Sequence, residues 1–401
     1  MTESNDLDVD IDKSVFAHVG RDTLAGRYLR RFWHPLYVAE DLAPGRAVPV
    51  RLLGEDFTLY RGESGEPHLV GFRCAHRGAQ MSIGWVEQDC LRCFYHGWAY
   101  DQNGQCVDQP VEHSKSAAKV HIGGYAVKES MGLVFAYIGG GQEPPFPRFP
   151  GFDDWEGISF SQVAHWRYNY FQSFENTVDL SHTSFVHKGS HGYSATIYYP
   201  NPERSAAGLT NVGRPEDGDS TFIGQLGMPN SFHMNFPLPP ADDLGVLMWW
   251  VPIDDENHLM VSVRRVPKRA EAWADGIKSW GENGSDPQVL AEEVLAGKKD
   301  RADVDLSTTN DIFFQDFLAQ RGQGVIQDRS TERLGQGDKA VSLLRRLWVE
   351  ELRKVARDEE ITKWASPTEG PVLYYKPVPA SELDALLDSP IRRDAQQVAA
   401  Q

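Results

Sequence analysis

Two short segments that each pair one cysteine with one histidine constrain this chain more than any other feature. The first is Cys74-x-His76 and the second is Cys93-x-x-His96, with residues 77–92 between them. The chain has only four cysteines in 401 residues, so two of them near histidines indicate a metal site rather than a disulfide framework. A zinc finger places its two cysteines in one segment and its two histidines in the other, which differs from the pairing here.

The mixed pairing is the one that a Rieske [2Fe–2S] cluster requires. In such a cluster two thiolates hold one iron and two imidazoles hold the other, which raises the reduction potential above that of an all-cysteine cluster. Gly78 and Gly97 would let the backbone approach the cluster closely. A zinc site, or buried side chains that bind no metal, is the alternative. We therefore predict two loops at the tips of hairpins that bind the cluster through Cys74, His76, Cys93 and His96. The other two cysteines, interpreted as ordinary buried thiols, are Cys90 and Cys106.

The overall charge and the apolar stretches exclude several classes of protein. A formal net charge of −17 argues against binding to nucleic acid or to anionic membranes, because both need clustered Lys and Arg. The N-terminal sequence MTESNDLDVDIDK is acidic and polar, unlike a secretory signal. The longest apolar stretch, 244–253, is too short to span a bilayer. We therefore expect a cytoplasmic protein that binds neither nucleic acid nor membrane.

Turn residues and apolar periodicity divide the chain into four parts. Residues 1–34 are predicted to form a tail and a short amphipathic helix (22–34) that stops at Pro35 and packs on the core. Strand-like segments follow in 35–145, separated by Gly, Pro, Asn and Asp at the spacing of a small antiparallel β-domain. The Gly- and Pro-rich stretch 139–154 marks the boundary to the next domain.

The other two parts are a second domain, 146–375, and a C-terminal tail, 376–401. Strands followed by helices predict an α+β fold for this domain, with an antiparallel sheet wrapped by helices. The segments with strand-like patterns are 221–227, 231–239, 245–253 and 258–266, and those with helical patterns are 287–298 and 338–360.

A second candidate metal site lies in the segment FENTVDLSHTSFVH, residues 174–187. Asp179 and His182 are three residues apart and would share a helix face. His187 follows His182 by five residues, so the helix must end or distort near 184–186 if both imidazoles are to reach one metal. Two histidines and one carboxylate on one face of an Fe(II) leave positions open for dioxygen. Buried histidines that bind no metal are the alternative.

The third ligand of this site must be a carboxylate from elsewhere in the chain. We favour Asp316, because an unpaired carboxylate in the apolar sequence FFQDFL would be costly unless a metal bound it. A capping or solvated Asp316 is the alternative. The other acidic residues considered are Asp303, Asp305, Asp311 and Asp328.

At these motifs the chain resembles the alpha (terminal oxygenase) subunits of Rieske non-heme iron oxygenases that hydroxylate aromatic rings. CAHRG, CFYHGWAYD and DQNGQC resemble that family's cluster loops and the strands after them, and E-N-x-x-D-x-x-H-x-x-x-x-H resembles its mononuclear-iron motif. LRRFWHPLY and the stretch from QDFLAQRGQG to LLRRLW resemble the phthalate-dioxygenase-like branch, which includes aromatic O-demethylases. The resemblance covers about residues 20–350. Phe94 departs from it, since the family often has proline there, but this residue is not a ligand.

The resemblance implies specific roles for the second site. His182, His187 and Asp316 would hold one mononuclear Fe(II) in a helix-grip-like catalytic domain. Asp179 would bridge the Rieske cluster of one subunit and the iron of its neighbour, as a buried carboxylate that accepts from a ligand histidine on each side. The other matches to the motif, included with Asp179 in the predicted catalytic group, are Glu175 and Asn176.

The partners follow from what the sequence contains. It has no G-x-G-x-x-G at a strand–helix junction and no further cysteine cluster, so we find no site for NADH, flavin or a plant-type cluster. Electrons would come from a separate NAD(P)H-dependent reductase, with or without a ferredoxin. The resemblance also implies a head-to-tail homotrimer, in which the Rieske domain of one subunit reaches the iron of the next.

The resemblance implies a terminal oxygenase that uses O2 to oxidise an aromatic acid. We favour mono-oxygenation, specifically O-demethylation of a methoxylated, lignin-derived aromatic carboxylate such as a biaryl, with release of formaldehyde. The alternatives are hydroxylation or cis-dihydroxylation of a phthalate-like or phenoxybenzoate-like acid, a Rieske electron carrier without oxygenase activity, and a structural zinc protein. His233 and Asn235 are interpreted as solvent-facing residues of a strand rather than as pocket residues. The arginines left unranked as partners of a substrate carboxylate are Arg204, Arg264 and Arg265.

Overall fold

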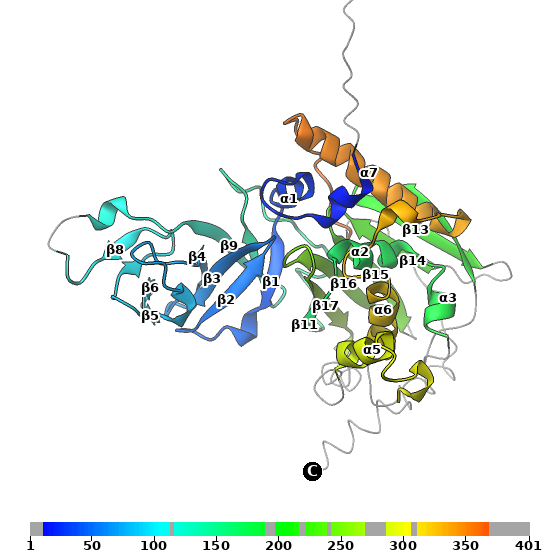
Figure 1. Cartoon of the computed structure of the whole chain (residues 1–401), viewed down its shortest axis with the longest axis horizontal. Coiled ribbons are helices and arrows are strands. Elements are labelled where there is room, and N and C mark those ends of the chain that lie inside the picture. Colours follow the sequence, from blue (N-terminus) through cyan, green and yellow to red (C-terminus); the bar gives the residue numbers. More distant parts are fainter. Residues whose placement is uncertain are drawn as a thin grey trace, which may run out of the picture.

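The chain forms an elongated molecule with a β-rich lobe at one end and a larger lobe of sheet and helices at the other (Figure 1). The computed structural model describes residues 11–112, 116–188, 197–215, 222–238, 242–268, 286–305 and 311–368, and the predicted C-terminal tail lies outside these residues. No helix in this described part is long and apolar enough to cross a membrane.

The smaller lobe contains two antiparallel sheets. The six-stranded sheet has the order β1-β10-β9-β4-β3-β2 and the four-stranded sheet the order β5-β6-β7-β8. The strands of the larger sheet are β1 (His34–Val38), β2 (Ala47–Leu52), β3 (Glu55–Arg61), β4 (Pro67–Gly71), β9 (Gly124–Ser130) and β10 (Leu133–Tyr137). Those of the smaller sheet are β5 (Trp85–Glu87), β6 (Cys90–Arg92), β7 (Ala99–Tyr100) and β8 (Cys106–Asp108).

The larger lobe is built on one seven-stranded antiparallel sheet with the order β11-β17-β16-β15-β14-β13-β12. Its strands are β11 (Ile158–Trp166), β12 (Tyr198–Arg204), β13 (Gly208–Pro215), β14 (Phe222–Gly227), β15 (Ser231–Leu238), β16 (Asp242–Pro252) and β17 (His258–Val266). Its helices are α2 (Tyr170–Val178), α3 (Thr183–Val186), α5 (Pro287–Leu295), α6 (Asp311–Arg321) and α7 (Lys339–Ala356). This arrangement confirms the predicted α+β fold with an antiparallel sheet wrapped by helices.

The two faces of the seven-stranded sheet pack against different partners. Alternate residues of a strand point to opposite faces. Met260 of β17 packs with Phe314 and Phe317 of α6. Val261 and Val263 of the same strand belong instead to the main core, which also contains residues of β1 and β10 in the other lobe. One face of the sheet is therefore the helix face, and the opposite face joins the two lobes.

The N-terminal segment packs beside the helices of the larger lobe. The helix α1 (Leu24–Leu29) begins at Thr23, whose hydroxyl accepts a hydrogen bond from the Gly26 amide at 3.1 Å. Tyr28 of α1 meets Trp348 of α7 edge to face, with 5.1 Å between ring centroids. The hydrogen bond stabilises the start of α1, and the aromatic contact holds α7 against this segment of the chain.

The prediction of one helix through residues 22–34 is wrong. The helix α1 ends at Leu29, and His34 already lies in strand β1 with Pro35. The strand β1 is at the edge of its sheet, where a proline is tolerated because no neighbour needs its missing N–H. Pairing with β10 therefore makes the chain extended, not helical, from His34 onward.

Candidate metal centres

Two loops of the same geometry carry the four predicted Rieske ligands. The first loop follows β4 and is closed by pairing of Arg73 with Gln80, and the second joins β6 to β7. In the first loop the Cys74 amide donates to the Ala79 carbonyl at 2.8 Å and the Gly78 amide donates back to Cys74 at 2.9 Å. The second loop repeats both bonds, at 2.8 and 3.0 Å, with Cys93, Trp98 and Gly97.

The glycines of these loops have a specific structural role. Gly78 has φ +74° and Gly97 has φ +73°, in the left-handed region that other residues rarely adopt. Each reverses the chain directly after a cysteine–histidine pair, so both loops turn tightly back on themselves. Both loops are hairpin tips, as the sequence predicted.

The donor atoms of the four residues are arranged by type. The thiols of Cys74 and Cys93 are buried, and burial together with the neighbouring Cys74 thiol raises the pKa of Cys93. The rings of His76 and His96 lie side by side nearer the surface, with 4.5 Å between centroids. Two thiols on the inside and two imidazoles on the outside fit a cluster with one thiolate-bound iron and one imidazole-bound iron.

Neighbouring side chains fix these donors. Trp98 stacks on His76 with 4.6 Å between centroids, and the Tyr100 hydroxyl lies 3.2 Å from the Cys74 sulfur. Cys106 is buried as predicted, whereas Cys90 is only partly buried, so the expectation of an ordinary buried thiol is wrong for Cys90.

The second candidate centre begins where helix α2 ends. The Asn169 side chain caps α2 by accepting from the Phe171 amide at 3.1 Å, and the helix stops at Val178. The short helix α3 then runs between His182 and His187, which flank it. The helix therefore breaks before His182, at residues 179–182, and not at 184–186 as the spacing suggested. This earlier break brings both imidazoles to one side.

The imidazoles of the second centre meet a carboxylate from helix α6. Ligand atoms of His182, His187 and Asp316 all lie within 4.8 Å of one another. The Asp316 Oδ1 atom is 3.7 Å from His182 Nε2 and 3.4 Å from His187 Nε2. Asp303, Asp305 and Asp328 do not belong to this group, and the side chain of Asp311 lies outside the described structure.

Each imidazole uses its Nδ1 atom in a hydrogen bond, which leaves its Nε2 atom directed at the Asp316 carboxylate. His182 Nδ1 lies 2.5 Å from the Asp179 backbone carbonyl, and His187 Nδ1 lies 2.8 Å from Gln315 Oε1. A carbonyl oxygen only accepts, so each Nδ1 carries the proton and donates it. The lone pair of each ring then remains on Nε2, on the Asp316 side. Two such imidazoles and one carboxylate are a donor set that fits Fe(II) and leaves positions open.

Gln315 was not identified from the sequence. It precedes Asp316 in helix α6 and accepts a hydrogen bond from His187 Nδ1. Adjacent residues of one helix therefore contact the two nitrogens of the same imidazole. Its position next to the favoured carboxylate was the available signal, but a single glutamine carries no spacing pattern.

Asn176 and Asp179 lie at the same site in different ways. The Asn176 amide donates to Asp316 Oδ1 at 3.3 Å and is 3.4 Å from His182 Nε2. The Asp179 carboxylate accepts from the Ser181 amide at 2.9 Å and stays 3.8 Å from His182 Nδ1. It is also 26% exposed, so within this chain it is neither buried nor bonded to the imidazole. The backbone carbonyl of Asp179, rather than its carboxylate, accepts the hydrogen bond from His182 Nδ1, because helix α2 ends just before this residue.

Glu175 points away from this group into an ion-pair network. Its side chain is buried and accepts from Arg329 at 2.8 Å and from Arg345 at 2.5 Å. Arg345 also forms two bonds to Glu332, at 2.5 and 2.7 Å. The network ties the helix of the metal site to helix α7.

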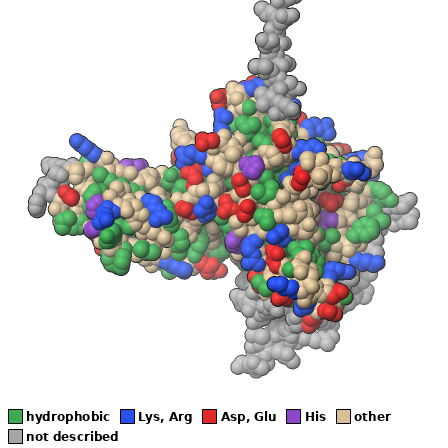
Figure 2. All heavy atoms as spheres, in the orientation of Figure 1, with side chains coloured by type: hydrophobic (Ala, Val, Ile, Leu, Met, Phe, Trp, Pro, Cys, Tyr) green, Lys and Arg blue, Asp and Glu red, His purple; other side chains and the backbone are tan. Residues whose placement is uncertain are grey.

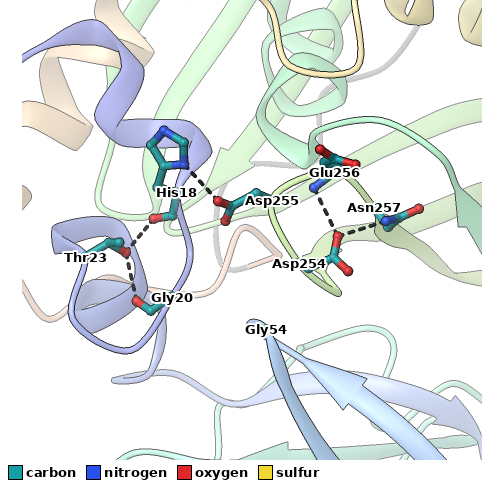
Figure 3. Close-up of a pocket in the computed structure, with 8 residues that line it drawn as sticks. All are labelled: His18, Gly20, Thr23, Gly54, Asp254, Asp255, Glu256 and Asn257. Carbon is teal, nitrogen blue, oxygen red and sulfur yellow. Dashed lines mark hydrogen bonds and ion pairs between the residues drawn. The ribbon is translucent and has the colours of Figure 1, made fainter.

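An open pocket of about 470 Å³ lies away from both centres (Figure 3). It is formed where the N-terminal segment meets the turn between β16 and β17. Its Asp255 accepts from His18 Nδ1 and from the Val19 amide, both at 2.8 Å. Asp254 Oδ1 accepts from the Asn257 side-chain Nδ2 at 2.8 Å. Asp255 therefore links the turn to the N-terminal segment, Asp254 bonds within the turn, and neither belongs to either metal centre.

His233 and Asn235 are placed differently from the expectation. Both are buried rather than solvent-facing. Asn235 accepts from Arg265 at 2.9 Å, and His233 packs edge to face on Phe152. They lie on the sheet face opposite α6, so they are not near the second centre.

Comparison with known proteins agrees with this geometry. Residues 32–125 match the Rieske [2Fe–2S] domain family. The 5,5'-dehydrodivanillate O-demethylase oxygenase subunit of Sphingobium sp. SYK-6 is 32% identical over 86% of this chain and 80% of its own length. The phenoxybenzoate dioxygenase subunit alpha of Ectopseudomonas oleovorans is 31% identical over 82% of this chain and 81% of its own.

A solved structure shares the same fold. The terminal oxygenase of carbazole 1,9a-dioxygenase from Novosphingobium sp. KA1 matches 82% of this chain and 95% of its own, with a TM-score of 0.58 at 23% identity. The identity to the curated relatives extends through both lobes and both candidate centres. The chain therefore belongs to the terminal oxygenase subunits of the Rieske non-heme iron oxygenase family, enzymes that carry one Rieske cluster and one mononuclear iron.

Proposed function

We propose that this oxygenase mono-oxygenates an aromatic carboxylate, and specifically removes the methyl group of a methoxylated aromatic acid as formaldehyde. The observation that carries the oxygenase chemistry is the group of His182, His187 and Asp316, whose ligand atoms lie within 4.8 Å of one another. The demethylation is supported by the relative named as an O-demethylase, at 32% identity.

The proposal assigns each predicted residue a role. Asp316 and the two histidines would hold the Fe(II), which when bound supplies the site for dioxygen activation. Asn176 would hold the Asp316 carboxylate through its amide. Glu175 would position α2 through its arginine partners rather than contact substrate. The ligands proposed for the cluster are Cys74, His76, Cys93 and His96.

We also propose that the active unit is a head-to-tail ring of copies, as in the predicted homotrimer. The β5 and β6 strands beside the cluster loops lie at one end of the molecule, and α3 beside the second centre lies near the other end (Figure 1). Electrons within one chain would have to cross the whole molecule. A neighbouring copy can instead bring its cluster loops to α3. Repetition of this contact closes a ring of copies if the rotation between neighbours permits.

Exposed apolar residues support this arrangement. Hydrophobic and basic side chains gather on the lobe that carries the cluster loops (Figure 2). The rings of Trp85 and Phe94 contact each other there in a tilted arrangement with 5.1 Å between centroids, and about half of each residue is exposed. Phe185 of α3 is 69% exposed beside His182 and His187. Apolar surface of this kind marks a contact between proteins. Asp179, partly exposed in one chain, would be covered in the ring.

Electrons would come from a partner protein. A solved structure similar to this chain holds the oxygenase of carbazole 1,9a-dioxygenase in complex with a ferredoxin. For this chain we propose an NAD(P)H-dependent reductase, acting directly or through a ferredoxin.

The test is turnover with a defined panel. The iron-loaded protein would be mixed in air with a reductase, NADH and aromatic acids with and without methoxy groups. We expect stoichiometric formaldehyde and a product lighter by one methylene. A product heavier by two oxygens and two hydrogens, without formaldehyde, would show cis-dihydroxylation and would contradict the demethylation. The relative named as a phenoxybenzoate dioxygenase makes that second reaction the main competitor.

A further inference from the structure

One largely buried arginine of the larger lobe, Arg264, has no acidic partner among the residues that the structure describes. Arg264 of β17 donates to the Gln162 side chain and to Ser262 Oγ at 3.2 Å, and its guanidinium lies over the Phe160 ring at 5.9 Å. None of these partners is charged, and no carboxylate of the described residues pairs with it. Burial lowers the pKa of Arg264 from its ordinary value to about 10. The side chain nevertheless keeps some accessible surface.

The other two arginines considered as substrate partners are already engaged. Arg204 lies at the surface and pairs with Glu350 at 2.8 Å. Arg265 donates to the Gly151 carbonyl at 2.7 Å and to Asn235. It also lies over the Phe152 and Trp155 rings, on the sheet face that joins the two lobes. The structure therefore ranks Arg264 first.

Arg264 is on the same side of the sheet as the second metal centre. Met260, four residues earlier in β17, packs on helix α6, which carries Asp316. Residues four apart on a strand share a face, so Arg264 also projects from the helix face. Around it the sheet presents an apolar surface. The side chains of this surface, from β11, β15 and β16, include Phe160, Met234, Val246 and Met248.

A buried charge without a counter-charge costs free energy. Folded proteins pair such charges, because desolvation of an isolated ion is expensive. Three arrangements would lower this cost: an ion pair with an acidic side chain, hydrogen bonds to ordered water, or binding of an anionic ligand. The hydrogen-bonding of Arg264 to Gln162 and Ser262 supplies no negative charge. The remaining N–H groups of the planar guanidinium match the two oxygens of a carboxylate.

We propose that Arg264 binds the carboxylate of the aromatic substrate, with Gln162 and Ser262 holding the guanidinium in place. This inference rests on the proposed function, because it assigns the acid group of that substrate. The apolar residues around Arg264 would take the aromatic body, and α6 would place the other end of the substrate toward the metal centre. The ligand class is therefore an aromatic acid whose carboxylate lies opposite its reacting group.

Binding without turnover tests the proposal. The iron-loaded protein would be titrated calorimetrically under nitrogen, without reductant, with 5,5'-dehydrodivanillate, phenoxybenzoate and phthalate. The corresponding primary amides have nearly the same shape and no charge. We expect wild-type protein to prefer at least one acid over its amide, and R264M to weaken binding of that acid about 100-fold. Binding of the amide should change little. R264K keeps the positive charge but not the planar guanidinium, so its affinity for the acid should lie between those of wild-type protein and R264M.

The matched control is R204M, which removes one positive charge from the surface and should keep the acid preference. Thermal unfolding of R264M without ligand gives a second measurement. Removal of an unpaired buried charge should leave the melting temperature unchanged or raise it. An acid preference that persists in R264M, or wild-type protein that binds none of the acids, would overturn the proposal. A lower melting temperature with unchanged acid binding would assign Arg264 a purely structural role.

The outcome is separable from that of the turnover experiment. Acid binding that depends on Arg264, with no formaldehyde in air, would leave the carboxylate site standing and contradict only the demethylation. Formaldehyde from neutral methoxyarenes, with no preference for acids, would support the demethylation and contradict the carboxylate site.

Discussion

The two metal centres are built in opposite ways. Each cluster loop is a closed hairpin tip, held by hydrogen bonds between residues no more than five positions apart. The second centre joins residues 182 and 187 to residue 316, more than a hundred positions later in the chain. Its orientation depends on Gln315 of α6 and on the break after α2. Local turn geometry therefore specifies the first centre, and packing of the larger lobe specifies the second.

This difference predicts that damage to the larger lobe should affect the second centre alone. The cluster loops keep their own hydrogen bonds whatever happens to α6 or α7. The following predictions test that independence, from the largest expected effect to the smallest.

Removal of a proposed ligand should abolish turnover at either centre but leave the other metal in place. H187A should lose the mononuclear iron and keep the two irons of the cluster, because the loops contain no residue of the second site. C93S should lose the cluster absorption and keep the mononuclear iron. Iron content and visible spectra would be measured on both variants. Loss of the cluster from H187A would show that the centres are not independent.

R345M should destabilise the larger lobe severely. It leaves buried Glu175 and partly buried Glu332 without this partner, and breaking a buried ion pair typically costs about 3–5 kcal/mol. Denaturant unfolding, followed by tryptophan fluorescence, would measure the loss. R346M is the matched control, because its exposed neighbouring side chain should change stability by less than about 0.5 kcal/mol. Equal effects of the two variants would contradict the structural importance of the network.

Q315L should weaken metal binding at the second centre about 10–100-fold, because His187 loses the acceptor that fixes its ring. The dissociation constant of Co(II) or Fe(II) would be measured, with the cluster spectrum as an internal reference. Q315E retains an acceptor oxygen and should retain affinity. Q323L changes an exposed glutamine just after the same helix and serves as the control. An unchanged metal affinity of Q315L would contradict the role of Gln315 in orienting His187.

His258 should make the larger lobe sensitive to mild acid. Burial lowers the pKa of this imidazole from 6.5 to about 3, and it lies 2.9 Å from the Tyr168 carbonyl. At a pH between about 3 and 6.5, the unfolded chain binds a proton at His258 that the folded chain excludes. The free energy of unfolding should therefore fall by about 1 kcal/mol from pH 7 to pH 5.5 through this group alone. Unfolding midpoints of H258Q should show a flatter pH dependence. H165Q, at an exposed position, should retain the wild-type dependence.

Helix prediction succeeded where one face of a helix differs from the other. Helix α7 has apolar residues at helical spacing, and its predicted range 338–360 overlaps the observed Lys339–Ala356. Helix α6 was missed because Gln315, Asp316 and Gln320 turn inward along with its phenylalanines. A helix with polar groups on its buried side shows no amphipathic pattern, and these polar groups are the ones that the site uses.

The sequence alone indicated which cysteines and histidines are proposed as metal ligands and in which order, because cysteine–histidine spacing within a hairpin and histidine spacing beside a helix end are local properties. It also indicated the α+β fold, since strand and helix periods are local as well. Only the tertiary structure decided that Asp316 meets both histidines and that Gln315 orients one of them. It also separated Arg264 from Arg204 and Arg265. Those distinctions depend on burial and on contacts between distant segments, and neither quantity is present in a single stretch of sequence.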